Sequence, residues 1–172
     1  MIPQIKKILY ATDLTKNSAY AFFYAVDMAT KHQASIIILH TIEPNWHYAD
    51  EVAGSQLAGA LIKVKKQAQE IDTEEIKKRL QQFCKRTEAQ FGAPCVDRVS
   101  KILVPLSYPV EEILKVADGE DCDVIILGTH GKGVLKQTFL GSVSKAVLER
   151  TRKPVYIIPL PSEKTDIDWD RV

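Results

Sequence analysis

Residues 123–133 read DVIILGTHGKG, an unbroken apolar run followed directly by three glycines within six residues. The run 123–127 is short and rich in β-branched residues, which predicts a strand buried on both faces. Residues 34–40, ASIIILH, form a second run of the same kind. Strands buried on both faces indicate a parallel sheet covered by helices on each side.

Apolar segments elsewhere complete this pattern. Three further strands are predicted, at residues 8–11, 96–104 and 154–158. Between the strands we predict a helix capped by Thr15, Asn17 or Ser18, two helices at 52–69 and 72–91 that form an insert, a helix that starts at Pro109, and a helix at 142–150. The order β-α-β-α-β-α-β-α-β, with its extra helical insert after the second strand, predicts an open five-stranded parallel α/β sheet with helices on both faces.

The length and composition narrow the function classes. The chain has 172 residues, which favours one domain, and we assign residues 1–160 to it and 161–172 to a polar C-terminal tail. We expect Trp169 to be a loosely docked tail residue. Lys and Arg number 23 against 22 Asp and Glu. This balance argues against a dedicated nucleic-acid binder, which usually shows a basic excess.

Cysteines and apolar runs bear on the compartment. The three cysteines are odd in number and show no CxxC spacing, which argues against a disulfide framework or a zinc site. We expect Cys84 and Cys122 to be small core residues. The start, MIPQIKKILYATD, lacks a signal-peptide run, and no stretch approaches the length of a membrane span. These features predict a soluble cytoplasmic protein without membrane contact.

In an open α/β sheet, ligands bind at the carboxyl ends of the strands where the strand order reverses. Four segments follow the first four predicted strands, at residues 11–13, 40–42, 105–107 and 128–131. We therefore expect a site built mainly from the first and the fourth of these segments.

The fourth segment has the composition of an anion site. Glycine permits close approach of backbone to a ligand, and Gly141-Ser142 opens a helix whose free N–H groups attract phosphate. Ser142 and Ser144 add hydroxyl donors, and Lys132 adds positive charge. The spacing fits neither the Gly-x4-Gly-Lys-Ser/Thr phosphate loop nor the GxGxxG dinucleotide motif. The alternative to an anion site is that this segment is a mobile glycine turn that binds no ligand.

Together these residues resemble a known family. Gly128-x2-Gly131-x9-Gly141-Ser142 is similar at every fixed position to the nucleotide motif of the universal stress protein family. The resemblance covers roughly residues 3–160. It extends to Lys7-Ile8-Leu9-Tyr10-Ala11-Thr12-Asp13, Leu39-His40-Thr41, Pro109-x-Glu111-Glu112-Ile113 and Lys153-Pro154-Val155.

The resemblance implies a fold, a ligand and an assembly. The fold is the Rossmann-like, adenine-nucleotide α-hydrolase-like sheet with strand order 3-2-1-4-5. The ligand is ATP, with Mg2+ or Mn2+ held by its phosphates and no metal ligand assigned to the protein. Members commonly form homodimers through the last strand. The implied dimer residues are Val155, Tyr156, Ile157 and Ile158.

The same resemblance assigns roles to residues at the site. It places Asp13 on the ribose or adenine side, the backbone of Thr41 on adenine, and the glycines along the ribose and phosphates. It assigns the β- and γ-phosphates to the start of the helix that begins at residue 142. The full implied nucleotide site is Ala11, Thr12, Asp13, Thr41, Gly128, His130, Gly131, Lys132, Gly141, Ser142, Val143 and Ser144.

Some residues depart from the family pattern or allow two interpretations. Ala11 stands where nucleotide-binding members often have proline, and Tyr108 follows a loop where glycine is common, so that its ring could narrow the site. Asp13 is either a helix cap, a ligand contact or both. His130 has no acidic neighbour in sequence to make it catalytic. We expect His40 to be a hydrogen-bonded core residue.

We therefore predict an ATP-binding module of stress response or signalling, acting through nucleotide-dependent loop order and partner binding. No catalytic residue is assigned, and weak ATPase activity is left open. Two alternatives stand beside this prediction. One is a slow ATP hydrolase, which needs a group to orient the attacking water. Asp13 is expected at the wrong end of the nucleotide for this role, which leaves His130 as the other candidate. The other is an AMP or cyclic-nucleotide sensor, or a scaffold without ligand.

Overall fold

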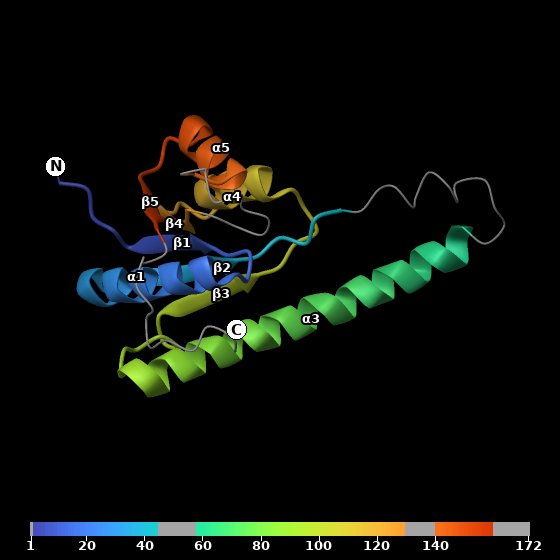
Figure 1. The fold of residues 1–172 in the computed structure, drawn as a ribbon, viewed down its shortest axis with the longest axis horizontal. Coiled ribbons are helices and arrows are strands. Elements are labelled where there is room, and N and C mark those ends of the chain that lie inside the picture. The colour runs from blue at the N-terminus through green and yellow to red at the C-terminus, as the bar shows by residue number, and fades with distance from the viewer. Residues whose placement is uncertain (1, 45–57, 130–139, 160–172) are drawn as a thin grey trace.

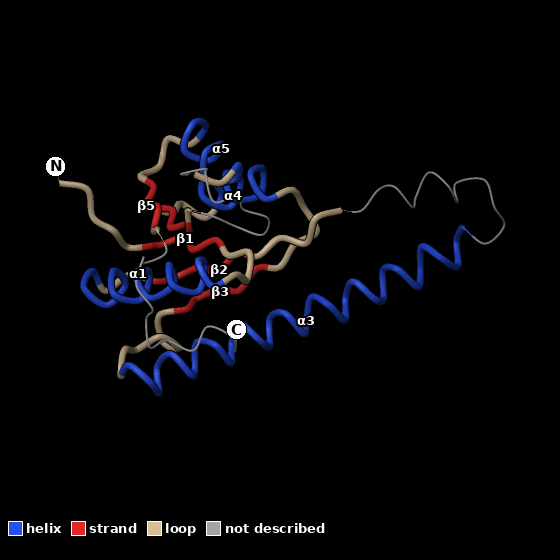
Figure 2. The backbone as a smooth tube through the Cα atoms, in the orientation of Figure 1, coloured by secondary structure: helices blue, strands red, loops and turns tan. Residues whose placement is uncertain are grey.

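The five predicted strands form one parallel sheet in the order β3-β2-β1-β4-β5, as expected. The computed structural model describes residues 2–44, 58–129 and 140–159 (Figures 1 and 2). The strands are β1 (Lys7–Ala11), β2 (Ser35–Leu39), β3 (Val99–Leu103), β4 (Val124–Gly128) and β5 (Val155–Ile158).

Helices cover both faces of this sheet (Figure 1). On one face lie α1 (Lys16–His32) and α3 (Ala58–Phe91), and on the other lie α4 (Pro109–Gly119) and α5 (Ser142–Arg150). None of the helices in the described ranges is both long enough and apolar enough to cross a bilayer.

Thr15 is the N-cap of α1, one of the three candidates that the sequence offered. Its side chain accepts a hydrogen bond from the Ser18 N–H at 3.4 Å, and its carbonyl accepts from the Ala19 N–H at 2.9 Å. Gln33 ends the helix in the left-handed conformation. The cap fixes the first turn of α1 directly after the end of β1.

The prediction of two separate helices in the insert was wrong, because α3 is continuous from Ala58 to Phe91. The start predicted at Asp72 rested on an acidic, cap-like sequence. No glycine or proline lies between residues 60 and 91, and Asp and Thr each cost a helix interior at most about 0.7 kcal/mol relative to Ala. The predicted end is confirmed, with Gly92 at φ 65°. Residues 52–57 of the predicted first helix lie outside the described residues.

β3 is shorter than predicted. Residues 96–98 form a turn, in which the Arg98 N–H donates to the Cys95 carbonyl at 3.2 Å, and the strand begins at Val99. The predicted strand included these turn residues because apolar content alone does not show where strand pairing starts.

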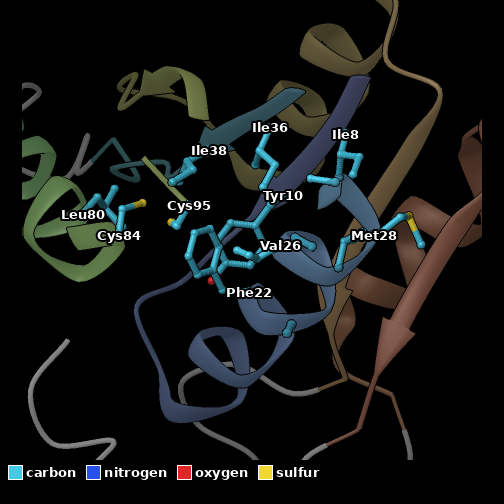
Figure 3. Packing of buried hydrophobic residues seen from close by; sticks show 14 of the residues in the cluster. Ile8, Tyr10, Phe22, Val26, Met28, Ile36, Ile38, Leu80, Cys84 and Cys95 are labelled. Atoms are coloured by element: carbon cyan, nitrogen blue, oxygen red, sulfur yellow. The ribbon is translucent and has the colours of Figure 1, made fainter. Parts of the chain in front are cut away.

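An aromatic stack fills the core between the sheet and the helices α1 and α3. The rings of Tyr10 and Phe22 lie 5.0 Å apart, and those of Phe22 and Phe83 lie 5.2 Å apart. In Figure 3 the sulfur atoms of Cys84 and Cys95 point toward each other beside this stack. Cys84, Cys95 and Cys122 are all buried and unpaired by disulfide, so the prediction of core cysteines is confirmed.

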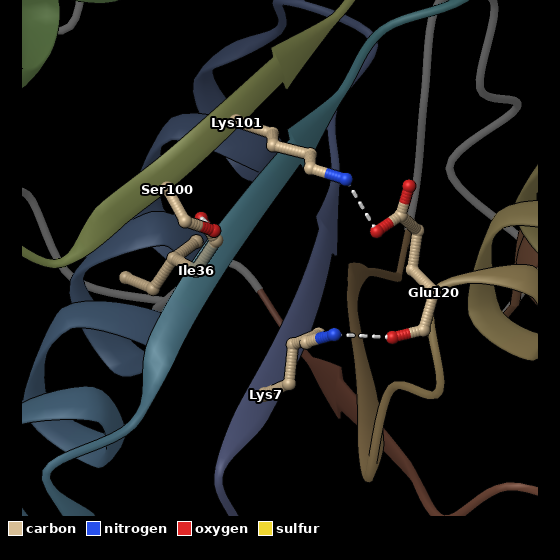
Figure 4. A network of polar contacts seen from close by, with 5 residues as sticks. All are labelled: Lys7, Ile36, Ser100, Lys101 and Glu120. Carbon is tan, nitrogen blue, oxygen red and sulfur yellow. Dashed lines mark hydrogen bonds and ion pairs between the residues drawn. The ribbon is translucent and has the colours of Figure 1, made fainter.

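A polar network joins β1, β3 and the residue that follows α4 (Figure 4). The Lys101 ammonium donates to the Glu120 carboxylate at 2.6 Å, and the Lys7 ammonium donates to the Glu120 carbonyl. The salt bridge with Lys101 holds the pKa of Glu120 below its ordinary value.

Candidate functional site

The strand order reverses between β1 and β4. The chain runs from β1 to β2 and β3 on one side, and β4 then pairs with β1 on the other side. The carboxyl ends of β1 and β4 therefore lie side by side, where a ligand site is expected in this architecture. This arrangement brings the predicted residues 11–13 next to Gly128.

Thr12 fixes the backbone at the end of β1. Its N–H donates to the Leu39 carbonyl at 2.9 Å. Its buried hydroxyl donates to Ser18 Oγ at 2.9 Å and accepts from the Leu14 N–H at 3.0 Å. The side chain thus holds the turn into α1, and Leu14 takes a positive φ of 64° within that turn.

Asp13 supports the cap of α1 without being the cap itself. Its Oδ1 accepts from the Thr15 N–H at 3.0 Å and from the Thr15 hydroxyl at 2.6 Å. The side chain is only partly buried. The sequence allowed Asp13 to be the cap of this helix. In the structure Asp13 instead holds Thr15, the residue that caps α1. The role toward a ligand stays a prediction.

His40 links the end of β2 to the end of β1. Its Nδ1 lies 2.8 Å from the Thr12 carbonyl oxygen, and its backbone N–H donates to the Leu103 carbonyl at 2.9 Å. A carbonyl accepts only from a protonated nitrogen, so Nδ1 carries a hydrogen in this arrangement. The prediction of a hydrogen-bonded core histidine is confirmed. Thr41 follows directly and is partly buried at the same edge.

Two hydrogen bonds attach the start of α5 to the end of β4. The Gly141 N–H donates to the Thr129 carbonyl at 2.7 Å, and the Ser144 hydroxyl donates to the Gly128 carbonyl at 2.8 Å. The Thr129 N–H donates in turn to the Ile158 carbonyl at 3.0 Å. The helix start is therefore held in place by β4, and β4 by the end of β5.

The first turn of α5 presents backbone donors at this position. Gly141 is the N-cap and has no side chain to offer as an acceptor. The first intrahelical bond runs from the Lys145 N–H to the Gly141 carbonyl at 2.9 Å. The N–H groups of Ser142, Val143 and Ser144 precede this bond, so the helix itself gives them no acceptor. Such a turn favours an anion.

Asn17 is a site residue whose role the sequence reading missed. Its Nδ2 donates to the Ile158 carbonyl at 3.2 Å, and its Oδ1 accepts from the Thr129 hydroxyl at 3.4 Å. Its position along α1 relative to the apolar residues could have indicated this role. Asn17 lies four residues before Ala21, which is fully buried, so it falls on the core stripe of α1.

A cavity of about 440 Å³ lies between the end of β2 and α3. It adjoins the site, because His40, which lines it, is hydrogen-bonded to Thr12. The contribution of α3 was not foreseen from the sequence. The lining residues are His40, Thr41, Ile42 and Glu43 after β2, and Asp72, Glu75, Ile76 and Arg79 on α3.

Several predicted residues are not placed together by the structure. His130, Gly131 and Lys132 lie outside the described residues. Tyr108 is the N-cap of α4, and half of its surface is exposed. Among residues 2–44, 58–129 and 140–159, no three His, Cys, Asp or Glu side chains gather as a metal-binding group.

The predicted dimer strand, β5, lies at the edge of the sheet. Tyr156 is half exposed, whereas Ile158 is buried in the core between the sheet and α1. An edge strand leaves one row of backbone groups available for pairing. Dimerisation stays a prediction.

Comparison with known proteins identifies the family. The sequence profile of the universal stress protein family matches residues 4–159. The chain belongs to the universal stress protein family. Universal stress protein MJ0577 of Methanocaldococcus jannaschii is 31% identical over 158 residues, covering 89% of this chain and 94% of that protein.

Solved structures of the family agree with the fold. The structure of MJ0577 superposes with a TM-score of 0.71 at 27% identity, covering 94% of this chain and all of the other. A universal stress protein solved in complex with cAMP gives a TM-score of 0.58 at 19% identity, covering 91% of this chain and 98% of the other. This chain thus shares its overall fold with both solved structures.

Proposed function

We propose that this universal stress protein binds an adenine nucleotide, ATP with Mg2+ or Mn2+, at the carboxyl ends of β1 and β4. The observation that carries the proposal is the attachment of α5 to β4. The Gly141 N–H bond to Thr129 and the Ser144 hydroxyl bond to Gly128 hold the N–H groups of residues 142–144 at the end of β4, the strand that pairs with β1. Membership of the family and the Gly-x2-Gly-x9-Gly-Ser spacing support it.

The donors at the site suit the parts of a nucleoside triphosphate. The N–H groups at residues 142–144 would hold the terminal phosphates, because a helix N-terminus combines free donors with a positive dipole end. Asp13 would accept from the ribose, and the backbone at Thr41 would contact adenine. A divalent cation would neutralise phosphate charge while bound to phosphate oxygens and water.

The role in the cell would follow from occupancy of this site. Nucleotide binding would change the order of the segment 128–144, and a partner protein would recognise the ordered state. A homodimer paired through β5 would present two such segments. This is a stress-response or signalling module whose output is binding.

An AMP or cyclic-nucleotide sensor is the second candidate. A protein with the same fold was solved with cAMP, which makes cAMP the first competing ligand to test. A slow ATP hydrolase is a third, because phosphoryl transfer depends mainly on positioning and charge neutralisation. Turnover that survives purification to constant specific activity, and that His130→Ala removes, would favour the hydrolase.

The test is direct identification of the ligand followed by comparison of affinities. The protein is purified without added nucleotide and denatured, and released small molecules are identified by mass spectrometry. Calorimetric titration then compares Mg-ATP, AMP and cAMP. If α5 holds the terminal phosphates, ATP should bind about 1–3 kcal/mol more tightly than AMP, roughly 5- to 150-fold. Equal affinities would favour the sensor, and absence of binding by all three would contradict the proposal.

A further inference from the structure

His40 is a buried polar residue at the edge of the sheet where the ligand is proposed to bind. It follows the last residue of β2, and only 9% of its surface is exposed. Burying a polar group is costly unless the group forms hydrogen bonds. Nδ1 of His40 lies 2.8 Å from the Thr12 carbonyl oxygen. The imidazole is therefore bound to one particular peptide group at the end of β1.

This hydrogen bond orients the peptide that joins Thr12 to Asp13. The peptide is trans, so its C=O and N–H groups point in opposite directions. The carbonyl points toward His40, and the Asp13 N–H consequently points away from His40 and from β2. β4 pairs with β1 on the side opposite to β2. His40 therefore determines how this peptide is turned where β1 and β4 end.

The backbone of residues 40–42 extends the pairing of β2 with β3. His40 and Ile42 both donate their backbone N–H groups to carbonyls of β3 or of the residues just after it, each at 2.9 Å. Neighbouring residues of an extended segment turn their backbone groups to opposite sides. The backbone groups of Thr41 therefore face the β1 side, where the imidazole meets the Thr12 carbonyl.

One side chain thus joins the two segments that are proposed to bind the adenosine part of the nucleotide. Asp13 is proposed to contact the ribose, and the Thr41 backbone is proposed to contact adenine. His40 is attached to β3 by its backbone and to the end of β1 by its side chain. Loss of the side-chain bond would let these two segments move relative to each other, whereas the start of α5 is held separately by β4.

We propose that His40 is a positioning residue for the adenosine end of the nucleotide. Its Nδ1–H group holds the peptide between Thr12 and Asp13 against the end of β2, in the orientation that receives ribose and adenine. This inference rests on the proposed nucleotide site. The role is separate from that of the N–H groups at the start of α5, because those groups act on phosphate.

Substitutions at His40 test whether the position of the donor matters. The amide nitrogen of asparagine can take the place of Nδ1, whereas that of glutamine falls nearer the place of Nε2, and leucine has no donor. We expect His40→Leu and His40→Gln to bind Mg-ATP about 3- to 10-fold more weakly, which corresponds to one hydrogen bond. His40→Asn should recover most of the parent affinity. His32→Asn is the matched control, because His32 is exposed at the end of α1.

A comparison of two ligands separates positioning from phosphate binding. Calorimetric titration measures the affinities of Mg-ATP and AMP for each variant that urea unfolding shows to be folded. His40→Leu should weaken both by the same factor, because both ligands carry the adenosine end. Ser142→Pro should instead weaken Mg-ATP more than AMP.

The outcomes of this comparison distinguish the inference from the proposed function. Unchanged affinities in His40→Leu, or a loss confined to Mg-ATP, would overturn the positioning role and leave the proposed nucleotide site intact. Equal losses in His40→Asn and His40→Gln would also overturn it, because the place of the donor would then not matter. A parent protein that binds neither ligand would overturn both the proposed function and this inference.

NMR of the imidazole gives a test that does not depend on the affinity of a variant. In protein that carries isotope-labelled histidine, the signals missing from His40→Asn are those of His40. We expect a hydrogen on Nδ1 that exchanges slowly with water. Saturation with Mg-ATP should shift these signals, because the bonded peptide contacts the ligand. A hydrogen on Nε2 alone, or signals that saturation leaves unchanged, would overturn the positioning role even where His40→Leu fails to fold.

Discussion

A Cβ atom added to Gly128 would lie 2.6 Å from Oδ1 of Asn17 and 2.9 Å from its Cγ. The backbone of Asn17 would also lie 3.3 Å away. Asn17 cannot easily move, because its amide holds the Ile158 carbonyl and accepts from Thr129. Glycine at 128 is therefore required by the packing of β4 on α1, independently of any contact with a ligand.

Gly128→Ala should lower the free energy of unfolding by about 1–3 kcal/mol, the usual cost of overpacking a tight contact. It should also weaken ATP binding, because the end of β4 carries the start of α5. Urea unfolding followed by circular dichroism measures the first effect. Gly119→Ala is the matched control, since nothing lies within 4 Å of its added Cβ. Equal stability of the two variants would contradict the packing argument.

The two roles of Asp13 can be separated by substitution. Asp13→Ala removes both acceptor bonds to Thr15 and should cost about 1 kcal/mol of stability. Asp13→Asn keeps an oxygen in the same place and should fold almost as stably. If the carboxylate also accepts from ribose, Asp13→Asn should still weaken ATP binding about fivefold, because hydrogen bonds to a charged group are the stronger ones. Unchanged affinity in Asp13→Asn would limit Asp13 to capping.

The donors at the start of α5 can be tested one at a time. Ser142 is the first helical residue, where proline is well tolerated, so Ser142→Pro deletes one N–H group with little change in stability. It should lower ATP affinity more than Ser142→Ala, which keeps the N–H group. Ser144→Ala should instead cost about 1 kcal/mol of stability, because its hydroxyl donates to Gly128. Calorimetry and urea unfolding together distinguish the two serines.

The fold could be predicted largely because its signals are local. The run Ile36-Ile37-Ile38 between polar segments is sufficient to indicate a strand buried on both faces, and Pro109 marks a helix start. The continuity of α3 could not be predicted in this way. The residues around Asp72 are compatible both with the start of a new helix and with the interior of a continuous one. The sequence alone therefore does not distinguish the two, and tertiary context decides.

The candidate site was predicted only where strand ends define it. Residues 11–13 and Gly128 could be placed together because parallel strands end at one edge. The contact between Asn17 and Gly128 could not, because it joins residues 111 positions apart and no repeating pattern encodes it. The wall that Arg79 and its neighbours on α3 give to the cavity was missed for the same reason.

The salt bridge between Lys101 and Glu120 predicts a pH dependence. Its hydrogen bond lowers the pKa of Glu120 in the folded state. A lowered carboxylate pKa stabilises the fold above the ordinary Glu value of about 4.3, and this contribution is lost as the pH falls through the lowered pKa. Glu120→Gln should therefore be less stable than the parent at pH 7 and equally stable well below pH 4.

Urea unfolding across this pH range measures the difference, and high salt should reduce it at pH 7 because the groups are partly exposed. Glu149→Gln offers a control, since Glu149 lies 4.0 Å from Lys145 at an exposed position. Its effect at pH 7 should be the smaller of the two. An undiminished Glu120→Gln difference at pH 3 would show that the salt bridge is not its cause.

The three cysteines should be unreactive in the folded protein. Burial raises the pKa of Cys122 to about 11, so only about one thiol in a thousand is ionised at pH 8. The hydrogen bond to Cys84, together with burial, also raises the pKa of Cys95. Because the thiolate is the attacking species, a thiol-specific reagent should label the native chain only as fast as the chain opens. In concentrated urea all three should react at once. Rapid native labelling confined to one position, mapped by mass spectrometry, would reveal local opening around that cysteine while the rest of the core stays folded.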